Sequence, residues 1–281
     1  MVRQFFKRAA FMSAALVLLL TLTGCGEAKF MEEKDMVAVT QNPTGTMVFE
    51  FTTNVNNQLH EYTVELGFEL YYDKAPITVT NFVYLASSGF WDKPETEGEI
   101  GEFIVDTVTT SYIAMGDKRY EKRDTDNDEE TPDEFTEVTV EPEYFIKGEF
   151  KENGFAKTVD GKTVARNDIP FELGTMYMLR SDSANSDSAY SRFGIIGTIL
   201  STDTSYKDKY AAFGKITSVK VTEGVVPVPS PGLNEDVFDK MRNAVVSSQR
   251  EDSITIISVT VNTYGAELTK NFKKNWTIKV K

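Results

Sequence analysis

Residues 64–92 read VELGFELYYDKAPITVTNFVYLASSGFWD, and two periodicities meet within them. From Tyr62 to Tyr72 apolar residues alternate with mostly polar ones, which is typical of a half-buried antiparallel strand. The spacing then becomes helical, with one apolar face formed by Val79, Phe82, Val83 and Ala86. Pro76 suits the first turn of this helix and Gly89 suits its C-terminal end. The segment therefore predicts a strand followed by a short helix.

Similar apolar segments recur along the rest of the chain. We expect further strands near residues 47–51, 103–109, 111–115, 144–150, 174–179, 193–200, 211–216 and 254–264. A second helix is expected from Asn234, with one apolar side formed by Val237, Phe238, Met241 and Val245. Many short strands with only two helices predict a mostly-β fold, either a barrel or a sandwich.

The N-terminus has the pattern of a secretory signal. Basic residues precede an apolar run from Ala9 to Leu22, which is short for a membrane-spanning helix of roughly 20 residues. The following Leu22-Thr23-Gly24-Cys25 resembles a bacterial lipobox, which implies cleavage before Cys25 and lipidation of its thiol. The alternative is an uncleaved anchor with a chance cysteine. In either case we expect the protein to lie at the extracytoplasmic face of a cell membrane.

The composition argues against several classes of protein. Cys25 is the only cysteine and His60 the only histidine, so an internal disulfide is excluded and a His/Cys zinc site is disfavoured. A Ser-His catalytic arrangement would have to use His60, which we interpret as a histidine in a surface turn. The formal net charge is −13 and becomes more negative without residues 1–24, which carry basic residues and no acidic ones. Such a surface repels nucleic acid, so nucleic-acid partners are not expected.

We divide the chain into a lipoprotein signal at 1–24, a flexible tether at 25–45, one domain at 46–265 and a C-terminal extension at 266–281. The domain contains an acidic insertion at about 117–143, whose run Asp124–Glu130 we interpret as a solvated loop. Calcium binding is the alternative, since carboxylates are calcium ligands, but the glycine and glutamate spacing of an EF-hand is absent. We therefore expect neither a metal nor a cofactor.

Several stretches resemble, in the same order, motifs of the cyclophilin-type peptidyl-prolyl isomerases, most closely the bacterial branch. Residues 64–92 resemble the opening strand and the Ala-Pro-x-Thr-Val-x-Asn-Phe helix start, and SYIAMGD resembles Phe-Met-Ile-Gln-Gly-Gly-Asp with one glycine missing. The other stretches are YFIKGEFKENGF, LGTMYMLRSDSANSDSAYSRFGI, YAAFGKI and ITIISVTVNTYG. The resemblance spans roughly residues 60–265 and implies a closed eight-stranded barrel capped by two helices.

The resemblance also implies a reaction, rotation about the X-Pro peptide bond, whose barrier is about 18–20 kcal/mol. Catalysis of this rotation needs an apolar cup for the proline ring and a donor that stabilises the twisted amide. In the family an arginine within Phe-His-Arg-Val supplies that donor. Here the corresponding stretch is Val105-Asp106-Thr107-Val108, with Thr107 at the arginine position, or Asp106 if the alignment shifts by one residue.

Other site positions also depart from the family pattern. Met115 and Arg192 replace glutamines, Gly194 replaces a phenylalanine and Tyr210 replaces a histidine. The resemblance assigns contacts with substrate to Tyr112, Ile113, Met115, Phe193 and Tyr210. Arg192 is our candidate for a displaced catalytic donor, with help from Thr107. Arg180 is the other nearby candidate, although the bacterial pattern carries an arginine at that position anyway. A further alternative is that Arg192 only pairs with surface carboxylates.

We therefore expect a monomeric isomerase of weak or residual activity that acts on Pro-containing peptides or unfolded exported proteins. The loss of one preorganised donor typically costs about 10²–10³ in rate, which is why the expected activity is weak. The alternative is an inactive cyclophilin-like module that holds Pro-containing segments without isomerising them. A third class is a structural envelope protein that uses the acidic insertion or the C-terminal extension.

Overall fold

The computed structural model describes residues 30–31, 36–55, 58–94, 101–123, 134–140, 144–197, 204–224, 226–227, 239, 241 and 254–269. The chain divides into two units, Met1–Phe30 and Met31–Lys281, and every described residue except Phe30 belongs to the second. Within this described part, no helix combines the length and the apolar character that crossing a membrane requires.

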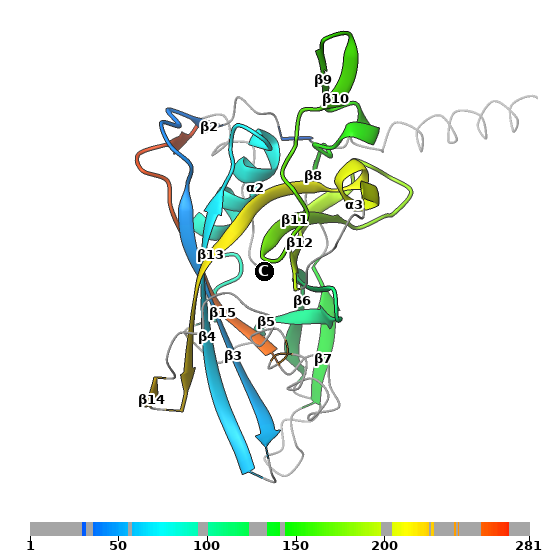
Figure 1. Ribbon diagram of the computed structural model, residues 1–281. Coiled ribbons are helices and arrows are strands. Elements are labelled where there is room, and N and C mark those ends of the chain that lie inside the picture. The colour runs from blue at the N-terminus through cyan, green and yellow to red at the C-terminus, as the bar shows by residue number, and fades with distance from the viewer. Residues whose placement is uncertain are drawn as a thin grey trace, which may run out of the picture. The chain divides into compact units, whose positions relative to one another are not determined.

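Eight antiparallel strands form a closed barrel in the second unit (Figure 1). The barrel strands are β3 (Thr44–Val55), β4 (Gln58–Leu70), β5 (Phe103–Val108), β6 (Tyr112–Arg123), β11 (Thr175–Arg180), β12 (Ala189–Ile196), β13 (Ala211–Glu223) and β15 (Ile254–Asn262). Their order is β3–β15–β5–β6–β12–β11–β13–β4, and pairing of β4 with β3 closes the barrel. The predicted mostly-β fold and closed eight-stranded barrel are confirmed.

Shorter elements flank the barrel. They are β1 (Phe30–Met31), β2 (Met36–Val37), β7 (Glu134–Thr139), β8 (Phe145–Ile146), β9 (Ala156–Val159), β10 (Lys162–Ala165), β14 (Val226–Pro227), β16 (Glu267–Leu268) and the 3₁₀ turn η2 (Lys151–Asn153). β9 and β10 form a separate hairpin, which Figure 1 shows projecting from the barrel. These elements are too short to leave a clear periodic pattern in the sequence.

The helix α2 (Pro76–Ser87) forms where the sequence predicts it, with Pro76 in its first turn. It has no side-chain cap of its own. The backbone N–H groups of Ile77 and Thr78 donate instead to the carboxylate of Glu149, at 3.0 and 2.7 Å. A buried carboxylate at a helix N-terminus satisfies two free donors and is stabilised by the helix dipole. Glu149 therefore fixes the start of α2 from a distant segment.

Replacing Glu149 with glutamine should lower the free energy of unfolding by about 1–2 kcal/mol. The amide removes the charge at the helix N-terminus and replaces one of the two acceptor oxygens with an NH₂ group, which cannot accept a hydrogen bond from the helix. Urea unfolding followed by circular dichroism measures the loss. Glu152→Gln, at an exposed site, is the matched control. An equal loss in both variants would contradict the role assigned to Glu149.

The second helix expected from Asn234 lies almost entirely outside the described residues. Only Asp239 and Met241 are described there, and both are helical. Within the described part of the chain, α2 is the one helix of seven or more residues, and the short α3 (Thr204–Lys209) was not predicted. The expected cap of two helices is therefore seen only in part.

The core of the barrel is built around the aromatic ring of Phe82, on the buried face of α2. Its ring lies 5.0–5.6 Å, between centroids, from four other aromatic rings, those of Phe68, Trp91, Phe193 and Phe213. All five side chains are at most 1% exposed. The apolar helix face predicted from the sequence thus packs against residues from three barrel strands.

The acidic insertion predicted at about 117–143 forms strands at both of its flanks. β6 continues to Arg123 and pairs with β7 from Lys118↔Thr139 to Arg123↔Glu134. The many charged residues in these two segments hid the pairing from a periodicity analysis, because an antiparallel ladder needs only backbone hydrogen bonds and a register. The run 124–130, on which the calcium alternative rested, lies outside the described residues.

Both ends of the domain differ from the predicted bounds. β3 begins at Thr44, and Met36 is only 3% exposed, so ordered structure begins inside the segment predicted as a tether at 25–45. β2 pairs with β16, which belongs to the predicted extension at 266–281. A pairing between residues near the two ends of the domain leaves no local signal in the sequence. The predicted signal at 1–24, Cys25 and residues 270–281 lie outside the described residues.

Candidate functional site

Side chains along β12 and β6 point alternately into and out of the barrel, and this alternation decides which predicted site residues face its interior. Phe193 pairs with Met115 and Ile195 pairs with Ile113 across the two strands. These four side chains are 0% exposed and belong to the main hydrophobic core. Because side chains alternate along a strand, Arg192 and Gly194 lie on the opposite, outer face. Phe193, Met115 and Ile113, expected to touch substrate, are therefore not accessible to a ligand outside the barrel.

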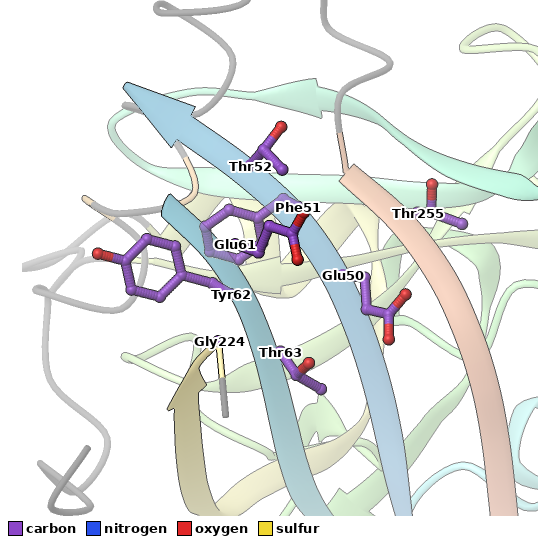
Figure 2. A pocket seen from close by; sticks show the side chains of 8 residues that line it. All are labelled: Glu50, Phe51, Thr52, Glu61, Tyr62, Thr63, Gly224 and Thr255. Atoms are coloured by element: carbon purple, nitrogen blue, oxygen red, sulfur yellow. The ribbon is translucent and has the colours of Figure 1, made fainter. Parts of the chain in front are cut away.

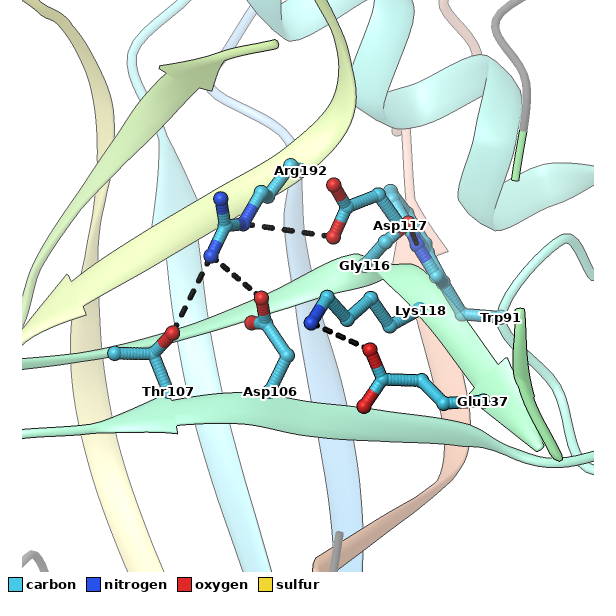
Figure 3. A network of polar contacts seen from close by, with 8 residues as sticks. All are labelled: Trp91, Asp106, Thr107, Gly116, Asp117, Lys118, Glu137 and Arg192. Carbon is cyan, nitrogen blue, oxygen red and sulfur yellow. Dashed lines mark hydrogen bonds and ion pairs between the residues drawn. The ribbon is translucent and has the colours of Figure 1, made fainter. Parts of the chain in front are cut away.

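Arg192 reaches from β12 over the outer faces of β5 and β6 (Figure 3). Its Nη2 lies 2.5 Å from Oδ2 of Asp106 and donates to Oγ1 of Thr107 at 3.3 Å. Its Nε lies 3.4 Å from Oδ1 of Asp117. In Figure 3 no dashed line reaches its second terminal nitrogen, Nη1. The structure thus brings together the two predicted catalytic residues, Arg192 and Thr107, along with two carboxylates.

The carboxyl group of Asp106 is the most buried part of this network, with 1% of its side chain exposed. Burial raises the pKa of Asp106 to about 6, and the Arg192 guanidinium opposes this increase. The carboxylate of Asp117 acts in the same direction as burial. Burial also raises the pKa of Asp117 itself. The Arg192 guanidinium and, to a smaller extent, the Lys118 ammonium therefore compensate two carboxyl groups that are both held partly away from water.

Tyr177 fills the outer face beside Gly194. A Cβ atom on Gly194 would lie only 2.6–2.8 Å from atoms of the Tyr177 ring, and Tyr177 is 1% exposed. Its ring centroid lies 5.5–6.3 Å from those of Tyr112, Phe171, Tyr206 and Tyr210. Burial raises the pKa of Tyr177, so its hydroxyl stays protonated. We call Tyr112, Tyr177, Tyr206 and Tyr210 the tyrosine cluster.

The sequence predicted only part of this tyrosine cluster. Tyr112 and Tyr210 were assigned as substrate contacts, whereas Tyr177 and Tyr206 were not. The alternating pattern of β11 gave no indication of Tyr177, because an aromatic residue in a strand fits either face of a sheet. Only the pairing of β11 with β12 brings Tyr177 opposite Gly194.

A depression with a volume of about 530 Å³ lies on the β3–β4 hairpin, away from these residues (Figure 2). Its lining is formed by Glu50, Phe51, Thr52, Glu61, Tyr62, Thr63, Gly224 and Thr255. None of these residues was predicted to have a function. His60, the only histidine, lies on β4, where its Nδ1 pairs with the carboxylate of Glu223. In the part of the chain that the structure describes, no three His, Cys, Asp or Glu side chains come together as a metal site.

Solved structures of low sequence identity resemble the chain. One is a cyclophilin-type peptidyl-prolyl cis-trans isomerase from Cryptosporidium parvum, with 14% identity, 77% of this chain and 98% of that chain covered, and a TM-score of 0.40. The same enzyme in the presence of the dipeptide Ala-Pro gives 15% identity, coverage of 78% and 98%, and a TM-score of 0.41. The Mimivirus cyclophilin gives 16% identity, coverage of 85% and 95%, and a TM-score of 0.42.

No curated protein sequence matches the chain. The sequence model of one protein family does match it, over residues 40–225, and that family is described as the cyclophilin type peptidyl-prolyl cis-trans isomerase/CLD. The matched segment covers seven of the eight barrel strands, the helix α2, the Arg192 network and the tyrosine cluster. The chain therefore belongs to the cyclophilin-type peptidyl-prolyl cis-trans isomerase family.

Proposed function

We propose that this protein is a weak peptidyl-prolyl isomerase in which Arg192 is the donor to the twisted amide. The observation that carries the proposal is the contact of 3.3 Å between Nη2 of Arg192 and Oγ1 of Thr107. Thr107 occupies the position that the family resemblance assigns to the catalytic arginine. On this proposal, the guanidinium of Arg192 takes the role of the preorganised donor that the reaction needs.

Two features of the same site account for a low rate. Asp106 and Asp117 compensate the positive charge of Arg192, which reduces the stabilisation that its guanidinium offers to an amide. Tyr177 fills the outer face beside Gly194, where the family resemblance places a phenylalanine. A proline ring would then rest on the half-buried rings of Tyr112 and Tyr210 rather than in a deep cup.

The proposed setting is the extracytoplasmic face of a cell membrane, with a lipid on Cys25 as the anchor. The basic and apolar N-terminus and its Leu-Thr-Gly-Cys ending support this location. The clients would be Pro-containing segments of exported proteins, whose slow X-Pro isomerisation limits folding. The protein would act as a monomer.

The test is the rate of cis/trans exchange of a short X-Pro peptide, measured by exchange NMR with the full chain in detergent. We expect slow but measurable acceleration by the wild type and none by Arg192→Gln. Asp106→Asn should raise the exchange rate about tenfold, because it removes one compensating charge and keeps an acceptor for Nη2. Asp160→Asn, at an exposed site, is the matched control and should leave the rate unchanged.

Tyr177 fills the space beside Gly194 and so leaves no deep cup for a proline ring. This favours a second candidate function, a module that binds Pro-containing segments without isomerising them. Peptide resonances that shift on binding, with no acceleration in either the wild type or Asp106→Asn, would support this module over the isomerase. Acceleration that persists in Arg192→Gln would remove Arg192 from the mechanism. The absence of both acceleration and binding would rule out both candidates for the peptide tested.

A further inference from the structure

Arg180, the last residue of β11, has surroundings unlike those of Arg192. Its guanidinium carbon lies 5.3 Å from the centroid of the Tyr210 ring and 5.8 Å from that of Phe150. The side chain is half-buried, and its Nε is buried without a hydrogen-bond partner among the described residues. Aromatic faces attract a guanidinium through their electrons but offer its N–H groups no in-plane acceptor.

Within the described part of the chain, Arg180 forms no ion pair, although the protein has 43 acidic and only 30 basic residues. The carboxylates of Asp182 and Asp187, in the loop after β11, have partners other than Arg180. Asp182 accepts the backbone N–H of Ala184 at 2.8 Å, and Asp187 accepts from the side chain of Asn153 at 2.7 Å. Arg180 therefore keeps a positive charge and hydrogen-bond donors that no carboxylate of this part of the chain satisfies.

The tyrosine cluster connects Arg180 to the proposed site. The ring of Tyr210 contacts Arg180, and its centroid lies 5.7 Å from that of Tyr177, the residue beside Gly194. These two spacings place the guanidinium carbon of Arg180 within about 11 Å of the centroid of the Tyr177 ring. An extended peptide advances about 3.3 Å per residue, so a segment lying across the cluster would reach Arg180 within about three residues of its proline.

We propose that Arg180 binds a carboxylate of the client, so that the preferred clients carry Asp or Glu within about three residues of the proline. The chemistry fits because a guanidinium held by aromatic rings is preorganised and binds a carboxylate through two parallel hydrogen bonds. The overall negative charge of the protein disfavours acidic clients at long range, so the preference depends on this one contact. This inference rests on the proposed binding of Pro-containing segments.

The test uses peptides of nine residues that contain one central proline and carry Glu, Gln or Lys three residues before or after it. Dissociation constants are measured by NMR titration with the full chain in detergent. Because a bound peptide runs in one direction, only one of the two positions, before or after the proline, should face Arg180. At that position, we expect the Glu peptide to bind the wild type about tenfold more tightly than the Gln peptide. The Lys peptide should bind most weakly.

The variant Arg180→Gln should bind the Gln peptide like the wild type and lose the preference for Glu, whereas Arg180→Lys should keep part of it. Arg166→Gln is the matched control, because Arg166 lies 4.8 Å over the ring of Phe155 at an exposed site and should not affect the preference. Equal binding of Glu and Gln peptides by the wild type would overturn this inference and leave the proposed function intact. If no peptide binds, the proposed function fails and this inference fails with it.

Discussion

Replacing Phe193 with alanine is expected to lower the free energy of unfolding by about 3–5 kcal/mol, the usual cost of removing a fully buried aromatic ring. The ring of Phe193 is 0% exposed and lies 5.3 Å from Phe82 and 5.4 Å from Trp91, between centroids. Gly116, at a positive φ of 106°, packs so closely that a Cβ there would lie 3.2 Å from this ring. Such packing leaves little freedom for neighbours to fill the cavity.

Urea unfolding at neutral pH measures this loss, and Phe155→Ala is the matched control. Phe155 is a partly exposed residue beside β9, so its replacement should cost far less. A fully stable Phe193→Ala protein with weakened peptide binding would contradict the assignment of this ring to the core. The expected instability also means that Phe193→Ala is a poor test of substrate binding, although the sequence suggested it as a site residue.

Between about pH 4 and pH 6 the ionisation of Asp106 is expected to weaken the fold. Its pKa is raised to about 6 in the folded protein by burial, from an ordinary value of 3.8. In this interval the folded state holds a proton that the unfolded chain has already released, so the stability contributed by this group falls as the pH rises. The difference between the two pKa values corresponds to a loss of about 3 kcal/mol in the free energy of unfolding from the acidic end of this interval to neutral pH. The raised pKa of Asp117 acts in the same direction.

The measurement is the free energy of unfolding of wild type and Asp106→Asn between pH 4 and pH 7. Because other groups titrate in this range, the informative quantity is the difference between the two proteins. We expect the wild type to lose up to about 3 kcal/mol relative to the variant as the pH rises. Asp160→Asn, a substitution at an exposed site, is the control. Its free energy of unfolding should follow that of the wild type across this pH range. Parallel pH curves for wild type and Asp106→Asn would contradict the assigned burial.

If both results hold, the two faces of β12 have separate roles. Phe193 on the inner face stabilises the barrel, and Arg192 on the outer face belongs to the network with Asp106. The same ionisation links stability to the proposed activity, since protonation of Asp106 removes one of the charges that compensate Arg192. We therefore expect the isomerase rate of the wild type to rise as the pH falls through about 6, which the exchange experiment can follow directly.

The sequence by itself determined the class of fold and several of its elements. The alternation from Tyr62 to Tyr72 and the helical spacing after Pro76 correspond to β4 and α2, because each pattern is a property of one contiguous segment. The order of the motifs gave the family, and with it the closed barrel. The short pairs β2–β16 and β9–β10 and the β7 strand escaped prediction, because they have too few residues or too many charged ones to show a period.

Only the tertiary structure decided which candidate residues meet and which face they occupy. Arg192 and Asp106 are 86 residues apart, and closure of the barrel between β12 and β6 sets their contact. The same register sends Phe193, Met115 and Ile113 into the core, although the family resemblance assigned them to the site. The position of Tyr177 beside Gly194 likewise depends on the pairing of β11 with β12. A local pattern specifies that a strand alternates, but the packed barrel specifies what each face of that strand contacts.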